Sequence, residues 1–260
     1  MATIPDVRER IQFTLEQYFR LEAELKQLEK DRFRVCIFGS ARMRPEDPVY
    51  DTVREMARML AELSIDVVTG GGPGLMEAAN RGLKEVTHGQ GVSYGLTIAL
   101  PRSQELANRH LDIKSEHKRF SSRLDEFMRL SHAVIVAPGG VGTLLELTYV
   151  WQLIQVGMIE RRPVVLLGRK FWDGLIEWMQ VQLLGNRLVS PGDFDWVHSV
   201  DRPEEALEFI QPELERFQAA MAGKAEGAER AAEAARMLEQ MEERRTRWGD
   251  PGLVQAPHTS

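Results

Sequence analysis

The sequence predicts an α/β fold built on a doubly wound parallel sheet, with flanking helices and a helical extension at each end. Short apolar runs alternate with longer amphipathic segments through the middle of the chain. The runs are apolar at successive positions, which is typical of strands buried on both faces. Three of them, ending at 38, 69 and 137, lead into glycine clusters. Ligands of such sheets bind at the carboxyl ends of the strands, so these clusters are the first candidates for a site.

The elements follow one another in a regular order. Strands are expected over 34–38, 65–69, 92–100, 133–137, 163–167 and 196–200. Helices are expected over about 48–63, 74–87, 119–131, 142–156, 171–184 and 202–217. Residues 103–117, a polar stretch with two histidines, are expected to be irregular. Right-handed crossovers between parallel strands then make the sheet Rossmann-like.

Four regions are expected along the chain: a helix over 1–31, a nucleotide-binding catalytic domain over 32–218, a charged helix over 219–247 and a disordered tail over 248–260. The first helix is amphipathic, because its apolar residues recur at three- and four-residue intervals: Ile4, Val7, Ile11, Leu15, Tyr18, Leu21, Leu25 and Leu28. An apolar stripe of this length indicates docking on a core or on a second subunit, and a homodimer or a larger homo-oligomer is expected.

Composition narrows the function classes. The 260 residues carry a net charge of -6, which disfavours binding of a nucleic acid polymer. Charged residues interrupt the N-terminal stretch and no window reaches the length of a membrane span, so a cytoplasmic protein without a membrane partner is expected. Cys36 is the one cysteine and lies in an apolar run, which indicates a buried core thiol. The scattered histidines form no spaced metal-ligand pair, and no metal site is predicted.

Two glycine turns dominate the candidate chemistry, and each follows a buried strand and opens a helix. They are Gly70-Gly71-Gly72-Pro73-Gly74 and Pro138-Gly139-Gly140-Val141-Gly142-Thr143. Glycines let a ligand approach the backbone, and a helix N-terminus offers amide groups to a phosphate. A tight turn without a ligand is the alternative for each. Neither turn has the third glycine of the dinucleotide motif or the Gly-Lys-Ser/Thr of a P-loop, which favours a mononucleotide or a sugar phosphate.

Two charged residues accompany the second turn. Glu146 lies one helical turn beyond Gly142 among apolar neighbours, where it is either a helix-dipole partner or part of a pocket wall. Arg123 lies on the preceding predicted helix, and a surface ion pair with Asp125 or Glu126 is its other interpretation.

Together these residues resemble the Lonely-guy family of phosphoribohydrolases, formerly labelled lysine decarboxylases. The resemblance rests on Gly70 to Met76, on Arg123, and on the motif from Pro138 to Glu146; it covers about residues 33–215. The segment Gly39-Ser40-Ala41-Arg42, after the first strand, also fits the family pattern. The chain departs from the family at Leu124, where a lysine usually follows the arginine.

The resemblance implies hydrolysis of the N-glycosidic bond of a nucleoside 5′-monophosphate, AMP or an N6-modified AMP, to free base and ribose 5-phosphate. It implies that Glu146 and Arg123 are catalytic. It further implies that the nucleotide and its phosphate are bound by two groups of residues: Gly139, Gly140, Val141, Gly142 and Thr143, and Gly39, Ser40, Gly71, Gly72, Gly74 and Met76.

The implied chemistry agrees with these residue types. A carboxylate stabilises the positive charge that develops on the sugar, and an arginine orients it, so no metal or organic cofactor is required. A lysine decarboxylase would need pyridoxal phosphate and a Schiff-base lysine, and neither glycine motif contains a lysine. The alternative is a non-catalytic carrier of a nucleotide or a phosphorylated cofactor on the same fold, which would need the loops but not Glu146 and Arg123. A scaffold protein that uses its terminal helices would leave the glycine loops unexplained.

Overall fold

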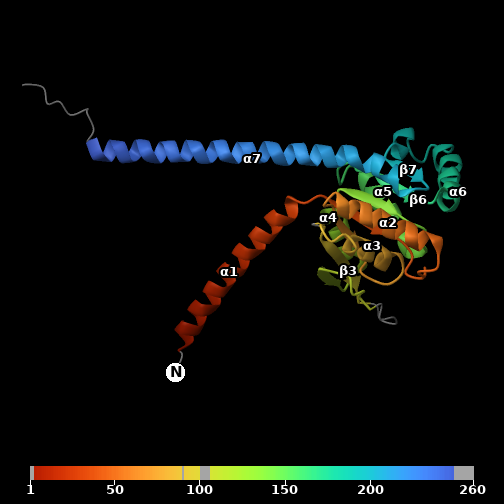
Figure 1. The fold of residues 1–260 in the computed structure, drawn as a ribbon, viewed down its shortest axis with the longest axis horizontal. Coiled ribbons are helices and arrows are strands. Elements are labelled where there is room, and N and C mark those ends of the chain that lie inside the picture. Colours follow the sequence, from red (N-terminus) through yellow and green to blue (C-terminus); the bar gives the residue numbers. More distant parts are fainter. Residues whose placement is uncertain (1–2, 90, 100–105, 249–260) are drawn as a thin grey trace, which may run out of the picture. The chain divides into compact units, whose positions relative to one another are not determined.

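The computed structural model describes residues 3–89, 91–99 and 106–248. Within them, seven parallel strands form one sheet in the order β4-β3-β2-β1-β5-β6-β7 (Figure 1). The strands are β1 Arg34–Phe38, β2 Asp66–Thr69, β3 Ser93–Ile98, β4 Ile113–His117, β5 Ala133–Val136, β6 Val164–Leu167 and β7 Val197–Val200. The chain first builds outward from β1 to β4, then returns to the other side of β1 and builds β5 to β7. This topology confirms the doubly wound, Rossmann-like fold.

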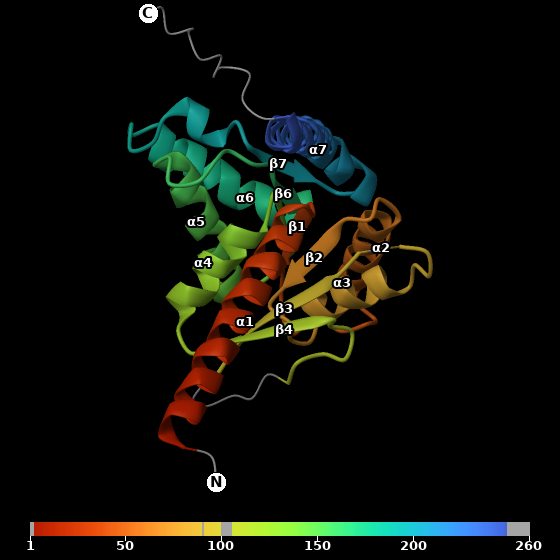
Figure 2. The ribbon, with the colours of Figure 1, turned by 90° about the vertical axis from the view of Figure 1, so that its left-hand side faces the viewer.

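Helices cover both faces of this sheet. The helices of the described residues are α1 Ile4–Lys30, α2 Pro48–Glu62, α3 Leu75–Lys84, α4 Phe120–Leu130, α5 Val141–Gln155, α6 Arg169–Met179 and α7 Pro203–Trp248. Helices α2 and α3 lie on one face, and α4, α5 and α6 lie on the other (Figure 2). Strands β1, β2, β5 and β6 are therefore buried at every position, which is why each reads as a continuous apolar run.

The expectation of irregular structure over 103–117 is wrong for residues 113–117, which form β4. This strand pairs with β3 in parallel register from Tyr94↔Ile113 to Ile98↔His117. It is the edge strand of the sheet and its residues are exposed or half-buried. An edge strand with little burial needs no apolar run, and charged residues there discourage pairing with other chains. Residues 103–105 and Leu100 lie outside the described part of the chain.

The two ends are helical. Helix α1 begins with a capping box in which the Asp6 amide donates to Thr3 Oγ1 and the Thr3 amide donates to Asp6 Oδ2.

Helix α6 is shorter than expected and passes into a π-helical turn, Gln180–Leu184. The helices expected over 202–217 and 219–247 are one continuous helix, α7. Contacts divide the chain into Met1–Leu214 and Glu215–Ser260. Of the predicted disordered tail, Trp248 ends α7 and the rest lies outside the described residues.

No helix of the described residues is both long enough and apolar enough to cross a lipid bilayer. The first turns of α7 bury Ala206, Ile210 and Leu214, at four-residue spacing, against the α/β core. Cys36 is fully buried in β1, as predicted.

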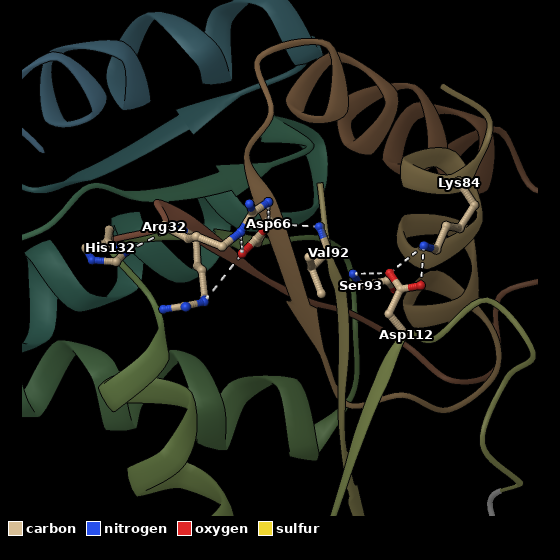
Figure 3. Close-up of polar contacts among 8 residues, drawn as sticks. Arg32, Asp66, Lys84, Val92, Ser93, Asp112 and His132 are labelled. Atoms are coloured by element: carbon tan, nitrogen blue, oxygen red, sulfur yellow. Dashed lines mark hydrogen bonds and ion pairs between the residues drawn. The ribbon is translucent and has the colours of Figure 1, made fainter. Parts of the chain in front are cut away.

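At the amino ends of β1, β2 and β3, hydrogen bonds and ion pairs link neighbouring segments. Asp66, the fully buried first residue of β2, accepts hydrogen bonds from Arg32 Nε at 2.7 Å and Nη2 at 2.5 Å, and from the Val92 amide at 2.8 Å (Figure 3). Arg34 Nε lies 3.6 Å from the same carboxylate. These bonds fasten the segment between α1 and β1 to two neighbouring strands.

His132 belongs to this edge (Figure 3). Its Nδ1 accepts the Arg34 backbone N–H at 3.1 Å, and its ring stacks on Phe33 with centroids 5.0 Å apart. Burial, and then the positive charges of Arg34 and Arg162, lower the pKa of His132 from 6.5 to about 4. Protonation of Nδ1 would also remove the acceptor of the Arg34 amide, so the folded protein holds this ring neutral.

We expect His132 to make folding stability depend on pH. Between pH 6.5 and about 4 the unfolded chain binds a proton at His132 that the folded chain does not bind, so stability falls as the pH falls through this window. The loss attributable to this residue is up to about 3 kcal/mol. Urea unfolding of the wild type and of His132→Asn, which keeps an acceptor but cannot titrate, measures it. The variant should show a shallower decline, and identical declines would contradict this role.

Candidate active site

A cavity of about 520 Å³ opens at the carboxyl ends of β1 and β5. These two strands lie side by side at the point where the strand order reverses, the usual ligand position in a doubly wound sheet. The volume of the cavity is within the range of small-molecule sites. Nine of the site residues singled out in the sequence line it: Gly39, Ser40, Met76, Arg123, Gly140, Val141, Gly142, Thr143 and Glu146. They come from four separate segments that only the fold brings together.

Glu146 and Arg123 face each other in this cavity. Helix α5 carries Glu146 on its second turn and α4 carries Arg123 on its first. Arg123 Nη1 lies 3.5 Å from Glu146 Oε1, and the two side chains are 10% and 13% exposed. Glu146 is therefore part of a pocket wall, and Arg123 pairs with it inside the cavity and not with Asp125 or Glu126 at the surface. At 3.5 Å the ion pair is longer than a charge-assisted hydrogen bond.

Arg123 is held on several sides. Its Nε donates to the carbonyl of Leu96 in β3 over 2.6 Å, and its guanidinium carbon lies 5.1 Å from the Phe127 ring centroid. These contacts fix the plane of the guanidinium and direct Nη1 toward Glu146. A planar fork held this way is suited to orienting a carboxylate and a substrate oxygen together.

Gly70 makes room for that guanidinium. A β-carbon at position 70 would lie 2.3 Å from Arg123 Nη2 and 2.5 Å from Met76 Sδ. Both distances are far below van der Waals contact, so only glycine lets Arg123 pack across the end of β2. Gly70 also lines the cavity. The first glycine turn therefore contributes to the site by shaping the position of the arginine.

The second glycine turn leaves a helix end exposed to the cavity. Gly140 is the N-cap of α5 and offers no side chain to cap its first amides. A β-carbon at Gly140 or Gly142 would meet nothing within 4 Å. Packing within the chain therefore gives no reason for glycine at either position, although glycine costs helical stability at Gly142. Open space in front of free amides is the geometry that an anion uses at a helix N-terminus.

Four of the predicted binding residues lie outside the cavity lining: Gly71, Gly72, Gly74 and Gly139. Gly74 caps α3 with φ +69°, and a β-carbon there would lie 2.4 Å from the Ser40 carbonyl. The Gly71 and Gly72 carbonyls accept hydrogen bonds from Asn108 Nδ2 at 3.2 and 3.0 Å. In the described structure these glycines support the loops, and a β-carbon at Gly139 would collide with Thr143.

Two further lining residues, Arg42 and Phe120, belong to segments noted in the family comparison but were not among the predicted binding residues. Arg42 adds an exposed positive charge, and Phe120, 51% exposed, adds an aromatic ring. Phe120 lies three residues before Arg123 on α4, so helical spacing relative to that arginine would have indicated it. Cys36 is not a nucleophile: burial, and then the Glu146 charge, raise the pKa of its thiol well above the normal value.

The family described as "possible lysine decarboxylase" matches residues 76–210, just over half of the chain. The chain belongs to this family. The match begins at Met76, beside the first glycine turn, and takes in Arg123 and the whole motif from Pro138 to Glu146.

Named relatives support the resemblance to the Lonely-guy family. A cytokinin riboside 5′-monophosphate phosphoribohydrolase, LOG2 of Arabidopsis thaliana, is 31% identical over 58% of this chain and 70% of its own length. A pyrimidine/purine nucleotide 5′-monophosphate nucleosidase of Escherichia coli K12 is 30% identical over 46% of this chain. This chain spans only 28% of that longer relative.

Solved structures support the fold. The molybdenum cofactor binding protein of Rippkaea orientalis has a TM-score of 0.52 at 20% identity, covering 70% of this chain and 98% of its own. The molybdenum cofactor carrier protein of Chlamydomonas reinhardtii has a TM-score of 0.51 at 20% identity, over 70% of this chain and 98% of its own. At this identity the likeness extends to the fold and not to the ligand.

The family description raises the question of pyridoxal phosphate chemistry, which needs a lysine to form the Schiff base. Among the described residues that line the cavity, the charged side chains are Arg42, Arg123 and Glu146, and none is a lysine. The residues therefore do not fit that cofactor. Two arginines and one carboxylate fit an anionic substrate that develops positive charge at another atom.

Proposed function

We propose that this protein hydrolyses the N-glycosidic bond of a nucleoside 5′-monophosphate, AMP or an N6-modified AMP, and releases the free base and ribose 5-phosphate. The observation that carries the proposal is a carboxylate–guanidinium pair, 13% and 10% exposed, in the same cavity as a helix N-terminus that has no side-chain cap. The named relatives, which are phosphoribohydrolases and a nucleosidase, support the substrate class.

In the proposed complex the phosphate is bound at the start of α5. The amides of the first turn and Thr143 Oγ1 donate hydrogen bonds to it, and Arg42 adds positive charge. The phosphate is remote from the bond that breaks, so its binding energy serves to hold the ribose in position. Phe120 offers an aromatic surface to the base.

Glu146 acts at the anomeric carbon in this proposal. As the bond between that carbon and the base nitrogen breaks, its electron pair leaves with the base, and positive charge builds on the sugar. The carboxylate stabilises that charge and takes a proton from the water that attacks the anomeric carbon. The base acquires a proton from solvent, and Glu146 then returns to solvent the proton it took from water, so the atoms and charges balance. Arg123, 3.5 Å away, orients the carboxylate.

Incubation with a panel of nucleoside 5′-monophosphates and the matching nucleosides tests the proposal. We expect base release from at least one purine monophosphate, at a kcat/KM about a hundredfold or more above that of its nucleoside, because the nucleoside lacks the charge-assisted phosphate bonds. Free base is measured by chromatography. Equal rates for nucleotide and nucleoside would contradict the phosphate site. If no monophosphate loses its base yet the nucleotides bind, the protein is a carrier.

A further inference from the structure

Helix α1, red in Figure 1, carries a seven-residue repeat that the α/β core does not need. One series recurs every seven residues and a second series follows it three residues later: Ile4, Ile11, Tyr18 and Leu25, and Val7, Thr14, Leu21 and Leu28. These series occupy the a and d positions of four successive heptads, and Thr14 alone among them is polar. A repeat of this period and length is the pattern of a coiled coil, narrower than the stripe of an ordinary surface helix.

We call the surface formed by these a and d positions the seam. The part of the seam whose side chains are described is exposed and carries a hollow. Ile11 is 54% exposed and Leu21 is 63% exposed. A hollow on the helix surface is lined by Val7, Arg10, Ile11 and Thr14, together with Leu15. The first four follow the spacing i, i+3, i+4, i+7. Four residues at this spacing form the hole that receives one side chain of a partner helix in knobs-into-holes packing.

We propose that α1 pairs with α1 of a second copy of this chain as an antiparallel coiled coil. In the antiparallel register the a position of one helix lies opposite the d position of the other, so Ile11 meets Leu21 and position 7 lies opposite position 25. Leu21 of the second copy then enters the hollow around Ile11. The same contact forms twice, because a two-fold axis near Glu16 relates the two helices.

Charge decides the direction of the pair. Positions e and g flank the seam. The charged residues at these positions are basic in the first half of α1 and acidic in the second half: Arg8 and Arg10, then Glu22, Glu24 and Glu29. The antiparallel register sets Arg8 against Glu22 and Arg10 against Glu24, each twice. In a parallel register the position of Glu24 would lie opposite that of Glu29, and two like charges would repel each other. Arg10 would lie opposite Leu15 and would have no counter-charge there.

Cysteine cross-linking of the full chain tests the pairing and its direction. The natural Cys36 is buried, so disulfides report the introduced thiols. Ile11→Cys and Leu21→Cys proteins are purified separately, mixed under reducing conditions and then oxidised. We expect a covalent dimer in the mixture and little in either protein alone. Phe13→Cys is the matched control, since Phe13 is 62% exposed but off the seam, and it should remain uncrosslinked.

The outcomes are distinct even if the α/β core also dimerises, because the cross-links report on α1 alone. Self-cross-linking of Ile11→Cys in place of the mixed dimer would show a parallel pair and overturn the proposal. Equal cross-linking of Phe13→Cys would show random collision and overturn it too. Arg8→Glu with Arg10→Glu should lower mixed-dimer yield at equilibrium about tenfold or more, and adding Glu22→Arg with Glu24→Arg should restore it.

Discussion

Replacing Glu146 with Gln is expected to slow base release from nucleoside monophosphates about a hundredfold or more while leaving the protein folded. The amide keeps the shape of the side chain but carries no negative charge to stabilise the sugar cation and cannot accept a proton from water. Glu146 is 13% exposed at a cavity wall and is not part of the apolar core, so the substitution removes little packing. Single-turnover rates and thermal unfolding of the same preparations measure both effects.

A matched control tests whether the effect comes from losing a carboxylate inside the cavity or from losing any nearby carboxylate. Asp125, on α4 two residues after Arg123, is exposed and accepts a hydrogen bond from Tyr149 over 2.5 Å without lining the cavity. Asp125→Asn should therefore retain near-normal turnover. If Glu146→Gln were as active as Asp125→Asn, Glu146 would be only a partner for Arg123, and the proposed chemistry would be wrong.

The central strands could be predicted from sequence because burial leaves a direct signature. Strand β5, with four buried residues in succession, was recognisable from its apolar run alone. Strand β4 was not, because an edge position allows Lys114, Ser115 and Glu116 where a central strand would have apolar residues. The parallel pairing of β4 with β3 depends on the neighbouring strand and leaves no local pattern in the polar segment.

The candidate site was only partly predictable, for a related reason. The glycine turns are visible in the sequence because each joins a buried strand to a helix. The different roles of their glycines are not visible in the sequence. A β-carbon at Gly140 would enter open space, whereas one at Gly74 would collide with the Ser40 carbonyl. The pairing of Arg123 with Glu146 was expected from the family resemblance and not from spacing. Arg42 enters the cavity only because β1 lies beside β5.

Gly70→Ala is expected to abolish most turnover although residue 70 would make no bond to substrate. The new β-carbon would lie 2.3 Å from Arg123 Nη2, so the guanidinium must leave its place opposite Glu146. Arg123 and Met76 side-chain ends can move, so the fold should survive. We therefore expect Gly70→Ala to lose activity about as severely as Arg123→Ala, roughly a hundredfold or more in kcat/KM.

Because both substitutions act on the same group, their effects should not add. The double variant Gly70→Ala/Arg123→Ala should be no slower than Arg123→Ala alone, since no guanidinium is left to displace. Gly174→Ala, at a helical glycine whose β-carbon would meet nothing within 4 Å, is the matched control and should behave as wild type. Full multiplication of the two losses in the double variant would mean that Gly70 acts independently of Arg123. Wild-type activity in Gly70→Ala would mean that turnover does not depend on the position of the arginine described here.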